Sequence, residues 1–278
     1  KTTSAVNLTA ALTALGLKVL LCDFDPQANA TSGMGVDKRK IKHSVYDVTI
    51  NNVPAKDAII KTNYGDVLPA SADLAGAGVE LITMDQPNFR LRNALQSIKE
   101  QYDLIFIDCP PSLEMLTLNS LCAADAILVP VQCEYYALEG LSQILKTVEL
   151  IHERLNADLK VEGIVFTMFD SRNNLSADVV ANVKENLDIP LFDTIIPRNV
   201  RLAEAPSYGI PIIDYDNRST GAASYRYIAK ELRKRAWESL RGKYWMAFAV
   251  VIVTGLIGSV GNAFVSFGQN LSEVLGLV

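Results

Sequence analysis

Five short apolar runs recur along the chain, and none of them alternates strictly between apolar and polar residues. They are KVLLCDFD (18–25), YDLIFIDCPP (102–111), DAILVPVQ (125–132), VEGIVFTMF (161–169) and DTIIPRN (193–199). Such a run is typical of a strand that is covered on both faces of a parallel sheet. The pattern therefore predicts five buried strands.

Stretches with helical spacing separate these runs. At the start of the chain, apolar residues from Val6 to Leu15 recur at helical intervals, and Gly16 follows where a helix commonly ends in a left-handed residue. Further helices are predicted over 138–156 and 175–187. Strands that alternate with helices predict a doubly wound α/β fold, with a mostly parallel sheet and helices on both faces.

Polar residues cluster where the predicted strands end. In a sheet of this type, ligands bind at the carboxyl ends of the strands. The residues at these ends are Asp23, Asp25, Asp108, Asp170, Arg172, Arg198 and Asn199. We expect the functional site at this edge of the sheet.

The first three residues, Lys1, Thr2 and Thr3, are typical of the end of a phosphate-binding loop. The amino terminus of the helix that follows favours an anion. In a P-loop the lysine bridges the β- and γ-phosphates, and the next hydroxyl binds Mg²⁺. The alternative is that a threonine merely caps the helix.

Two aspartates add to this signal. Asp108 ends the run LIFID, as the Walker-B aspartate that holds Mg²⁺ does. Asp25 lies before Pro26, which ends the first run, and its carboxylate is placed to position an attacking water. Each aspartate alone could simply cap a turn, but the three signals in this order are far more specific.

Six longer segments that include these motifs resemble a known protein family. They are KTTSAVNLTAALTALGLKVLLCDFDPQANATSGMG, LPASADLAGAGVEL, YDLIFIDCPPSL, ILVPVQCEYYALEGL, TMFDSRNNLS and IIPRNVRLAEAPSYGIPI. In order and spacing they resemble the ParA/Soj partitioning ATPases, P-loop NTPases with the deviant Walker-A loop K-G-G-V-G-K-T-T. The related MinD-type ATPases fit RNVRLAEAPSYG less well.

The resemblance implies roles for the residues of these motifs. Lys1 matches the lysine that grips the phosphates, and Thr3 matches a neighbouring phosphate contact. Thr2 matches the Mg²⁺ ligand and Asp108 the Walker-B aspartate. Asp25 matches the aspartate that orients the hydrolytic water, so Lys1 and Asp25 are the expected catalytic residues.

Further residues are implied for the nucleotide base and for DNA. Met168, Pro197 and Asn199 lie in segments that line the adenine pocket in relatives. Arg172 and Arg201 match arginines that the family uses for DNA. Each arginine has an alternative reading, an ion pair with a nearby carboxylate such as Asp170 or Glu204.

The family implies ATP and Mg²⁺ as cofactors and a homodimer that forms with ATP. It also implies non-specific DNA binding, hydrolysis stimulated by a ParB-like partner, and a cytoplasmic, nucleoid-associated location. A different class of function, a membrane-tethered MinD-like positioning ATPase or nucleotide-switch scaffold, is the alternative.

The resemblance defines an ATPase domain over 1–235. In the family a first strand, the phosphate-wrapping glycines and a signature lysine precede the position of Lys1. None of them is found in these 278 residues, so we expect a missing central strand and weak ATP binding.

The tail lies outside the resemblance. Residues 244–267 contain no charged side chain and are long enough to span a membrane as one helix. Basic residues precede this stretch, in the expected linker 236–243, and Glu273 is the charged residue of the short tail 268–278. The prediction is a C-terminal membrane helix, with a buried hairpin, a soluble extension or added sequence as alternatives.

Charge and cysteine content refine this picture. The net charge of −5 argues against a uniformly basic DNA-binding protein, yet residues 218–243 carry eight Lys or Arg against two Glu. This asymmetry points to an anionic polymer or membrane surface near the C-terminal end. The four cysteines lack metal-ligand spacing and are expected to be reduced core thiols, and neither histidine is assigned a catalytic role.

Overall fold

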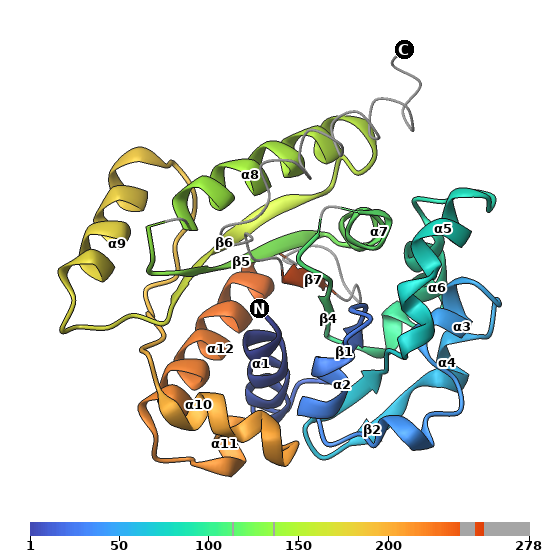
Figure 1. The fold of residues 1–278 in the computed structure, drawn as a ribbon, viewed down its shortest axis with the longest axis horizontal. Coiled ribbons are helices and arrows are strands. Elements are labelled where there is room, and N and C mark those ends of the chain that lie inside the picture. Colours follow the sequence, from blue (N-terminus) through green and yellow to red (C-terminus); the bar gives the residue numbers. More distant parts are fainter. Residues whose placement is uncertain (113, 136, 240–247, 253–278) are drawn as a thin grey trace.

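The structure is a computed structural model that describes residues 1–112, 114–135, 137–239 and 248–252. Its strands are β1 (Val19–Asp23), β2 (Ile60–Thr62), β3 (Gly65–Leu68), β4 (Leu104–Asp108), β5 (Ala126–Gln132), β6 (Lys160–Thr167) and β7 (Phe248–Ile252). They form one sheet in the order β2-β3-β1-β4-β7-β5-β6 (Figure 1). Each neighbouring pair is parallel except β2 and β3.

Helices cover both faces of this sheet. They are α1 (Thr2–Ala14), α2 (Asn29–Gly33), α3 (Val45–Thr49), α4 (Ala55–Ala58), α5 (Ala77–Ile82), α6 (Arg90–Gln96), α7 (Met115–Ala123), α8 (Ala137–Arg154), α9 (Asn174–Asn186), α10 (Val200–Glu204), α11 (Ile212–Tyr215) and α12 (Thr220–Ser239). One core cluster lies under α1, α2 and α10 to α12, and the other under α3 to α9. This arrangement confirms the predicted doubly wound α/β fold.

The apolar runs become strands because both sides of the sheet exclude water. Every residue of β1 and of β4 is buried, as are the first six residues of β5. Four of the five predicted strands are therefore confirmed, and the two long predicted helices appear as α8 and α9.

The fifth predicted strand, 193–199, is wrong. The segment beside β6 makes only isolated bridges, including Phe169 with Pro197, and a hydrogen bond of 2.8 Å from Ile196 N–H to Phe166 C=O. The left-handed Met168, with a φ of 56°, ends β6 and shifts the pairing by one residue, so Arg198 N–H donates to the Phe169 carbonyl at 2.8 Å and no continuous ladder forms. An apolar run can thus lie along a sheet without forming a strand.

Two strands, β2 and β3, were not predicted. They are only three and four residues long, and β2 alternates between half-buried and exposed positions. Gly65 begins β3 with a φ of 122°, and a Cβ at this position would lie 2.9 Å from Thr9 Cγ2 of α1. Only glycine permits this close approach of the strand to α1.

Helix α1 is buried on nearly all sides. Its residues from Ser4 to Leu12 are buried between the sheet and α12, where the Ser4 and Tyr225 hydroxyls are 3.2 Å apart. Gly16 has a φ of 85°, as the predicted helix end requires. This packing fixes the start of α1, and hence Lys1, against the sheet edge.

Strand β7 comes from the tail that the sequence analysis assigns to a membrane helix. It lies parallel between β4 and β5, with Ile252 in register with Asp108 (Figure 1). A helix spanning 244–267 is therefore wrong for these five residues, and the rest of that segment lies outside the described residues. The described helices include no candidate for a membrane span.

The position of β7 also changes the expectation of a missing central strand. Strand β4 pairs only with β1 and β7, and β5 pairs only with β6 and β7, among the described strands. Strand β7 is thus the hydrogen-bonded link between two halves of the sheet. An apolar five-residue segment suits this place because a central parallel strand is covered on both faces.

Truncation tests this role of β7. A chain that ends at Ser239 should melt roughly 10 °C or more below a chain that ends at Ile252, because it exposes the facing edges of β4 and β5 and loses their backbone hydrogen bonds. Thermal unfolding followed by circular dichroism measures the difference. Equal melting temperatures would show that β7 does not hold the halves together.

Candidate active site

Three aspartates and one lysine meet at the carboxyl edge of β1 and β4. Asp23 and Asp108 are register partners at the ends of these strands. Asp25 follows two residues after Asp23, and Lys1 stands at the start of α1. The structure thus brings together Lys1, Asp25 and Asp108, which the sequence analysis singled out from positions far apart in the chain.

Lys1 is held between the carboxylates. Its Nζ donates to Asp25 Oδ2 at 2.8 Å and to the Cys109 carbonyl, and it lies 3.7 Å from Asp108 Oδ1. Burial of the ammonium acts to lower its pKa, but the negative charges around it, Asp108 first, outweigh this and raise the pKa of Lys1. Lys1 is therefore a firmly protonated cation.

Asp108 is buried without a full set of partners. Neither of its carboxylate oxygens has a hydrogen bond of good geometry, although the Thr2 hydroxyl is close enough to act on its charge. Burial raises the pKa of Asp108, while the Lys1 ammonium opposes this rise. Unsatisfied buried carboxylate oxygens are rare in native proteins and often mark the site of an ion.

The threonines lie on the first turn of α1. Thr2 is the first residue of the helix, and the Thr3 carbonyl accepts a 2.7 Å hydrogen bond from Asn7 Nδ2. Lys1 occupies the N-cap position without a side-chain cap. The alternative reading, that Thr2 or Thr3 caps α1, is thus wrong.

Asp23 is a site residue that the sequence analysis noted only as a polar strand end. It is fully buried and accepts hydrogen bonds from the Thr31 N–H and hydroxyl, both at 2.7 Å, and from Asp25 N–H at 3.3 Å. Burial and then the charge of Asp108 raise the pKa of Asp23 to about 7, although these hydrogen bonds act to lower it.

The raised pKa gives a pH-dependent stability. Below about pH 4 Asp23 is protonated in both the folded and the unfolded state. Between about pH 4 and pH 7 the unfolded chain ionises while the folded state keeps the proton, so stability falls across this range and levels off above it. Relative to Asp23→Asn, the wild-type melting temperature should therefore fall between pH 5 and pH 8 in EDTA. A difference that is the same at both pH values would contradict this assignment.

Met168, Pro197 and Asn199 gather at the end of β6. Met168 has a left-handed φ of 56° and is partly exposed, and Pro197 bridges to Phe169 beside it. The Asn199 side chain caps α10, accepting from Arg201 N–H at 2.9 Å, and donates to the Thr220 hydroxyl at 2.8 Å. The three residues lie at the same edge of the sheet as Asp108, since β4, β7, β5 and β6 follow one another as parallel strands.

Both arginines assigned to DNA form ion pairs in the structure. Arg172 makes two hydrogen bonds, of 2.9 and 2.7 Å, to Asp170, and its side chain is 85% exposed. The Arg172 side-chain hydrogen bonds hold the pKa of Asp170 well below its usual range. The alternative reading of Arg172 as an ion-pair partner is thus observed, but its exposure leaves it accessible.

Arg201 is paired in the same way. It contacts Glu204 at 2.9 Å and Asp216 at 3.6 Å, and its side chain is 55% exposed. Exposed pairs of this kind are weak, so they do not prevent an exchange of partners for a phosphate.

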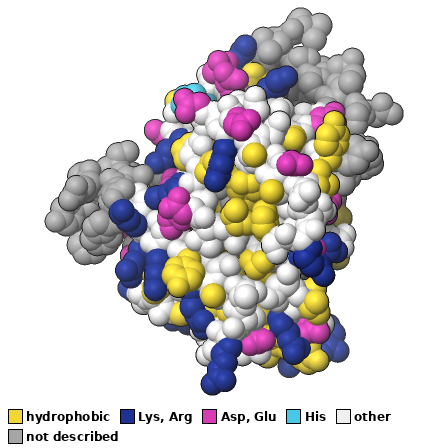
Figure 2. All heavy atoms as spheres, turned by 90° about the vertical axis from the view of Figure 1, so that its left-hand side faces the viewer, with side chains coloured by type: hydrophobic (Ala, Val, Ile, Leu, Met, Phe, Trp, Pro, Cys, Tyr) yellow, Lys and Arg dark blue, Asp and Glu magenta, His cyan; other side chains and the backbone are white. Residues whose placement is uncertain are grey.

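The basic C-terminal region forms an exposed face of α12. Its exposed residues are Arg226, Tyr227, Lys230, Arg233 and Lys234. Figure 2, which views the molecule from the α9 and α10 side, has basic and acidic side chains interspersed rather than one basic patch. The basic side chains on this face are exposed and could contact an anion, but they are separated by acidic ones.

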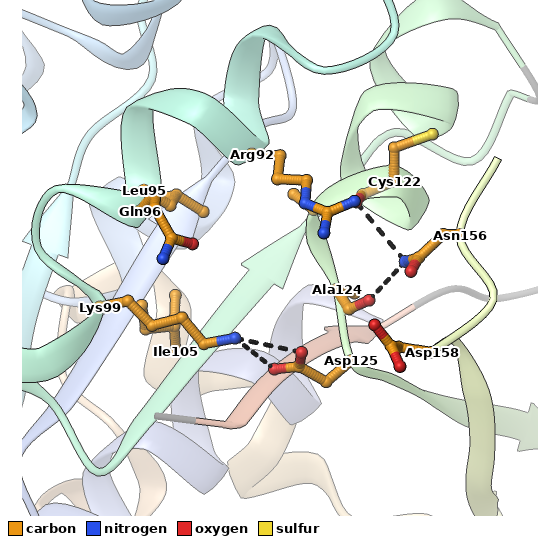
Figure 3. A pocket seen from close by; sticks show the side chains of 11 residues that line it. Arg92, Leu95, Gln96, Lys99, Ile105, Cys122, Ala124, Asp125, Asn156 and Asp158 are labelled. Carbon is orange, nitrogen blue, oxygen red and sulfur yellow. Dashed lines mark hydrogen bonds and ion pairs between the residues drawn. The ribbon is translucent and has the colours of Figure 1, made fainter. Parts of the chain in front are cut away.

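A small cavity of about 50 Å³ lies at the opposite, amino edge of β4 and β5 (Figure 3). Lys99 pairs with Asp125 at 3.0 Å, and Asn156 Nδ2 donates to the Ala124 carbonyl at 2.7 Å. Arg92 and Asp158 bring one further charge of each sign. The charges balance and the space is small, so we assign no ligand to this cavity.

The four cysteines are buried thiols, as expected of the core. Burial raises the pKa of Cys109 to about 12 and that of Cys133 to about 11. His152 Nδ1 lies 2.9 Å from the Leu159 carbonyl, a contact that ties α8 to the start of β6.

Known proteins are similar to this chain in sequence. A family model described as an AAA domain matches residues 1–161. The sporulation initiation inhibitor protein Soj of Bacillus subtilis is 51% identical over 234 residues, which cover 84% of this chain and 92% of Soj. The chromosome partitioning protein ParA of Myxococcus xanthus is 50% identical over 237 residues, 84% of each chain.

Solved structures share the fold. A cobyrinic acid a,c-diamide synthase from Mycobacterium smegmatis, with bound ATP analogue and magnesium, has a TM-score of 0.74 and 36% identity, covering 89% of this chain and 93% of that one. The cell division ATPase MinD from Pyrococcus furiosus has a TM-score of 0.70 and 27% identity, covering 84% and 92%.

Fold and site together define a P-loop nucleoside triphosphatase of the MinD/ParA type. Because about half of its residues are identical to those of Soj and ParA over most of its length, the chain belongs to the ParA/Soj family of chromosome-partitioning ATPases. It is an ATPase by this membership.

Proposed function

We propose that this chain couples Mg²⁺-dependent ATP hydrolysis to DNA partition, with Lys1, Asp25 and Asp108 as the centre of the site. The observation that carries the proposal is the position of the Lys1 ammonium between these two carboxylates at a strand edge. An ammonium next to a helix amino terminus attracts phosphate, and the carboxylates supply the acidic groups that such a reaction needs.

The residues present fit Mg²⁺. Asp108 offers two buried oxygens without good hydrogen-bond partners, and Thr2 places a hydroxyl beside them. Mg²⁺ usually takes one or two carboxylates and fills its remaining positions with water and phosphate oxygens. When bound, the ion supplies charge neutralisation on the phosphates. Asp108 and Thr2 are the residues that would hold it.

Lys1 and Asp25 bind the phosphates and orient the attacking water, respectively. The Lys1 ammonium binds the phosphates, with Thr3 as a neighbouring contact. When it does so, its hydrogen bond to the Asp25 carboxylate is replaced by one to a phosphate oxygen. The Asp25 carboxylate is then available to accept a hydrogen bond from the attacking water and orient it. Positioning and charge account for most of the catalysis in phosphoryl transfer.

Replacing Asp25 tests this role. Asp25→Ala should lower kcat for ATP hydrolysis by about 100-fold or more, with ATP affinity changed only a few-fold, because Asp25 orients water and does not bind the nucleotide. Steady-state phosphate release and equilibrium ATP binding measure the two quantities. The control is Asp57→Ala, an exposed carboxylate on α4; normal turnover in Asp25→Ala would remove the proposed mechanism.

The same proposal includes the base pocket and the partners. We assign adenine contacts to Met168, Pro197 and Asn199, which share one edge with the phosphate site. An ATP-bound homodimer binds DNA through Arg172 and Arg201, and a ParB-like protein stimulates hydrolysis. The names of the relatives, which are chromosome partitioning proteins, support this reading and a place on the nucleoid in the cytoplasm.

Salt dependence tests the DNA contacts. Arg201→Ala and Arg172→Ala should each weaken ATP-dependent binding to random duplex DNA about 3- to 10-fold at low salt, and reduce the slope of log affinity against log salt by about 1. Fluorescence anisotropy across a salt series measures both. Arg92→Ala, at the opposite edge of the sheet, is the matched control, and an effect equal to that of Arg92→Ala would exclude a direct contact.

A further inference from the structure

We propose that Asp23 is a positioning residue for hydrolysis, which holds the Asp25 loop in place through the Asp25 backbone. The proposal rests on the proposed role of Asp25 as the residue that orients the water. It concerns a residue that makes no contact with Lys1 in the structure and that is buried beneath the loop.

Asp23 ties the loop to the sheet and to α2. Its Oδ1 accepts from Asp25 N–H at 3.3 Å, and its Oδ2 accepts from the N–H and hydroxyl of Thr31, each at 2.7 Å. Both Asp23 and Thr31 are fully buried. One carboxylate therefore fixes both ends of the loop that carries Asp25.

Thr31 extends the same connection. Its hydroxyl donates to Asp23 and accepts from Ala70 N–H at 3.1 Å, in the segment that follows β3. Asp23 thus bonds directly to the Asp25 loop and to α2, and through Thr31 it is linked to the segment after β3. Hydrogen bonds within such a buried network are stronger than at a surface and define one arrangement.

The loop needs this support because its backbone is strained. Ala28 has a left-handed φ of 51°, which a residue with a Cβ adopts at a cost, just before α2 begins. Hydrogen bonds hold the turn: Ala28 N–H donates to the Asp25 carbonyl at 2.8 Å, and Phe24 N–H donates to the Asp108 carbonyl at 2.8 Å. The surrounding structure therefore determines the loop's conformation.

The contact from Asp23 becomes decisive when Lys1 moves. In this structure the Asp25 carboxylate is held by Lys1 Nζ at 2.8 Å and by Gln27 N–H at 3.0 Å. A phosphate that draws Lys1 away removes the first of these contacts. Asp25 is then placed by its own loop, whose link to β1 is the hydrogen bond to Asp23.

The substitution Asp23→Asn breaks this link selectively. The single carbonyl oxygen of asparagine can satisfy Thr31, but its NH₂ group then faces the Asp25 N–H, donor against donor. We expect kcat to fall about 10- to 100-fold, because small displacements of a positioning group have such effects. The affinity for a non-hydrolysable ATP analogue should stay within about threefold of wild type.

Two comparisons separate positioning from general stability. Thr31→Val keeps the Thr31 N–H and the Asp25 link but removes the hydroxyl, so it should lower the melting temperature and reduce kcat clearly less than Asp23→Asn does. If Asp23 acts through Asp25, the double variant Asp23→Asn with Asp25→Ala should be no slower than Asp25→Ala alone. A role in stability alone predicts that the two losses multiply.

Each outcome decides one claim. Wild-type kcat in Asp23→Asn, with Asp25→Ala inactive, overturns this inference and leaves the proposed function standing. Normal turnover in Asp25→Ala overturns the proposed function itself. Should Asp23→Asn not fold, Asp23→Ser, which leaves room for a water to accept the Asp25 N–H, replaces it and must show the same fall in kcat.

Discussion

The site depends on one electrostatic constraint, the confinement of a lysine cation between the carboxylates of Asp25 and Asp108 at the edge of two strands, with Asp23 buried beside them. Asp23 and Asp108 are fully buried, and Asp25 and Lys1 nearly so. Burial raises the pKa of both Asp23 and Asp108, because a buried carboxylate is costly to ionise, and the Lys1 ammonium opposes this rise at Asp108. A fold that tolerates this arrangement is prepared for a further cation, and the P-loop class uses Mg²⁺ in this place.

The rest of the molecule is arranged around this cluster. Helix α1 sets Lys1, β1 and β4 set the carboxylates, and α2 links the Asp25 loop to the segment that carries Arg201. The last contact is close: a Cβ at Gly35, just after α2, would lie 3.1 Å from the Gly209 carbonyl, and one at Gly209 would lie 3.1 Å from the Ser32 carbonyl. The end of α2 and the turn at Gly209, which follows α10, therefore pack backbone against backbone.

The local pattern of apolar residues and glycines predicted the structure correctly where a single physical constraint determined it. Buried runs such as residues 104–108 became strands, and Gly16 ended α1, because burial on both faces and a left-handed cap leave few alternatives. The pattern failed at β2 and β3, which are short and partly exposed, and at 193–199, where the left-handed Met168 shifts the pairing with β6. Asp23 escaped notice as a site residue because its neighbours Thr31 and Ala70 are brought to it only by the folding of α2 and β3.

By itself the sequence determined the α/β class and the P-loop family, and it singled out Lys1, Asp25 and Asp108, which the structure brings together. Those features depend on short runs of neighbouring residues, which can be recognised without knowing how the chain folds. Only the tertiary structure decided that Arg172 and Arg201 rest in ion pairs, that Asp23 supports the Asp25 loop, and that Phe248–Ile252 is a strand. An apolar segment is compatible with a membrane or with a protein core, and here the hydrogen-bonding edges of β4 and β5 select a strand.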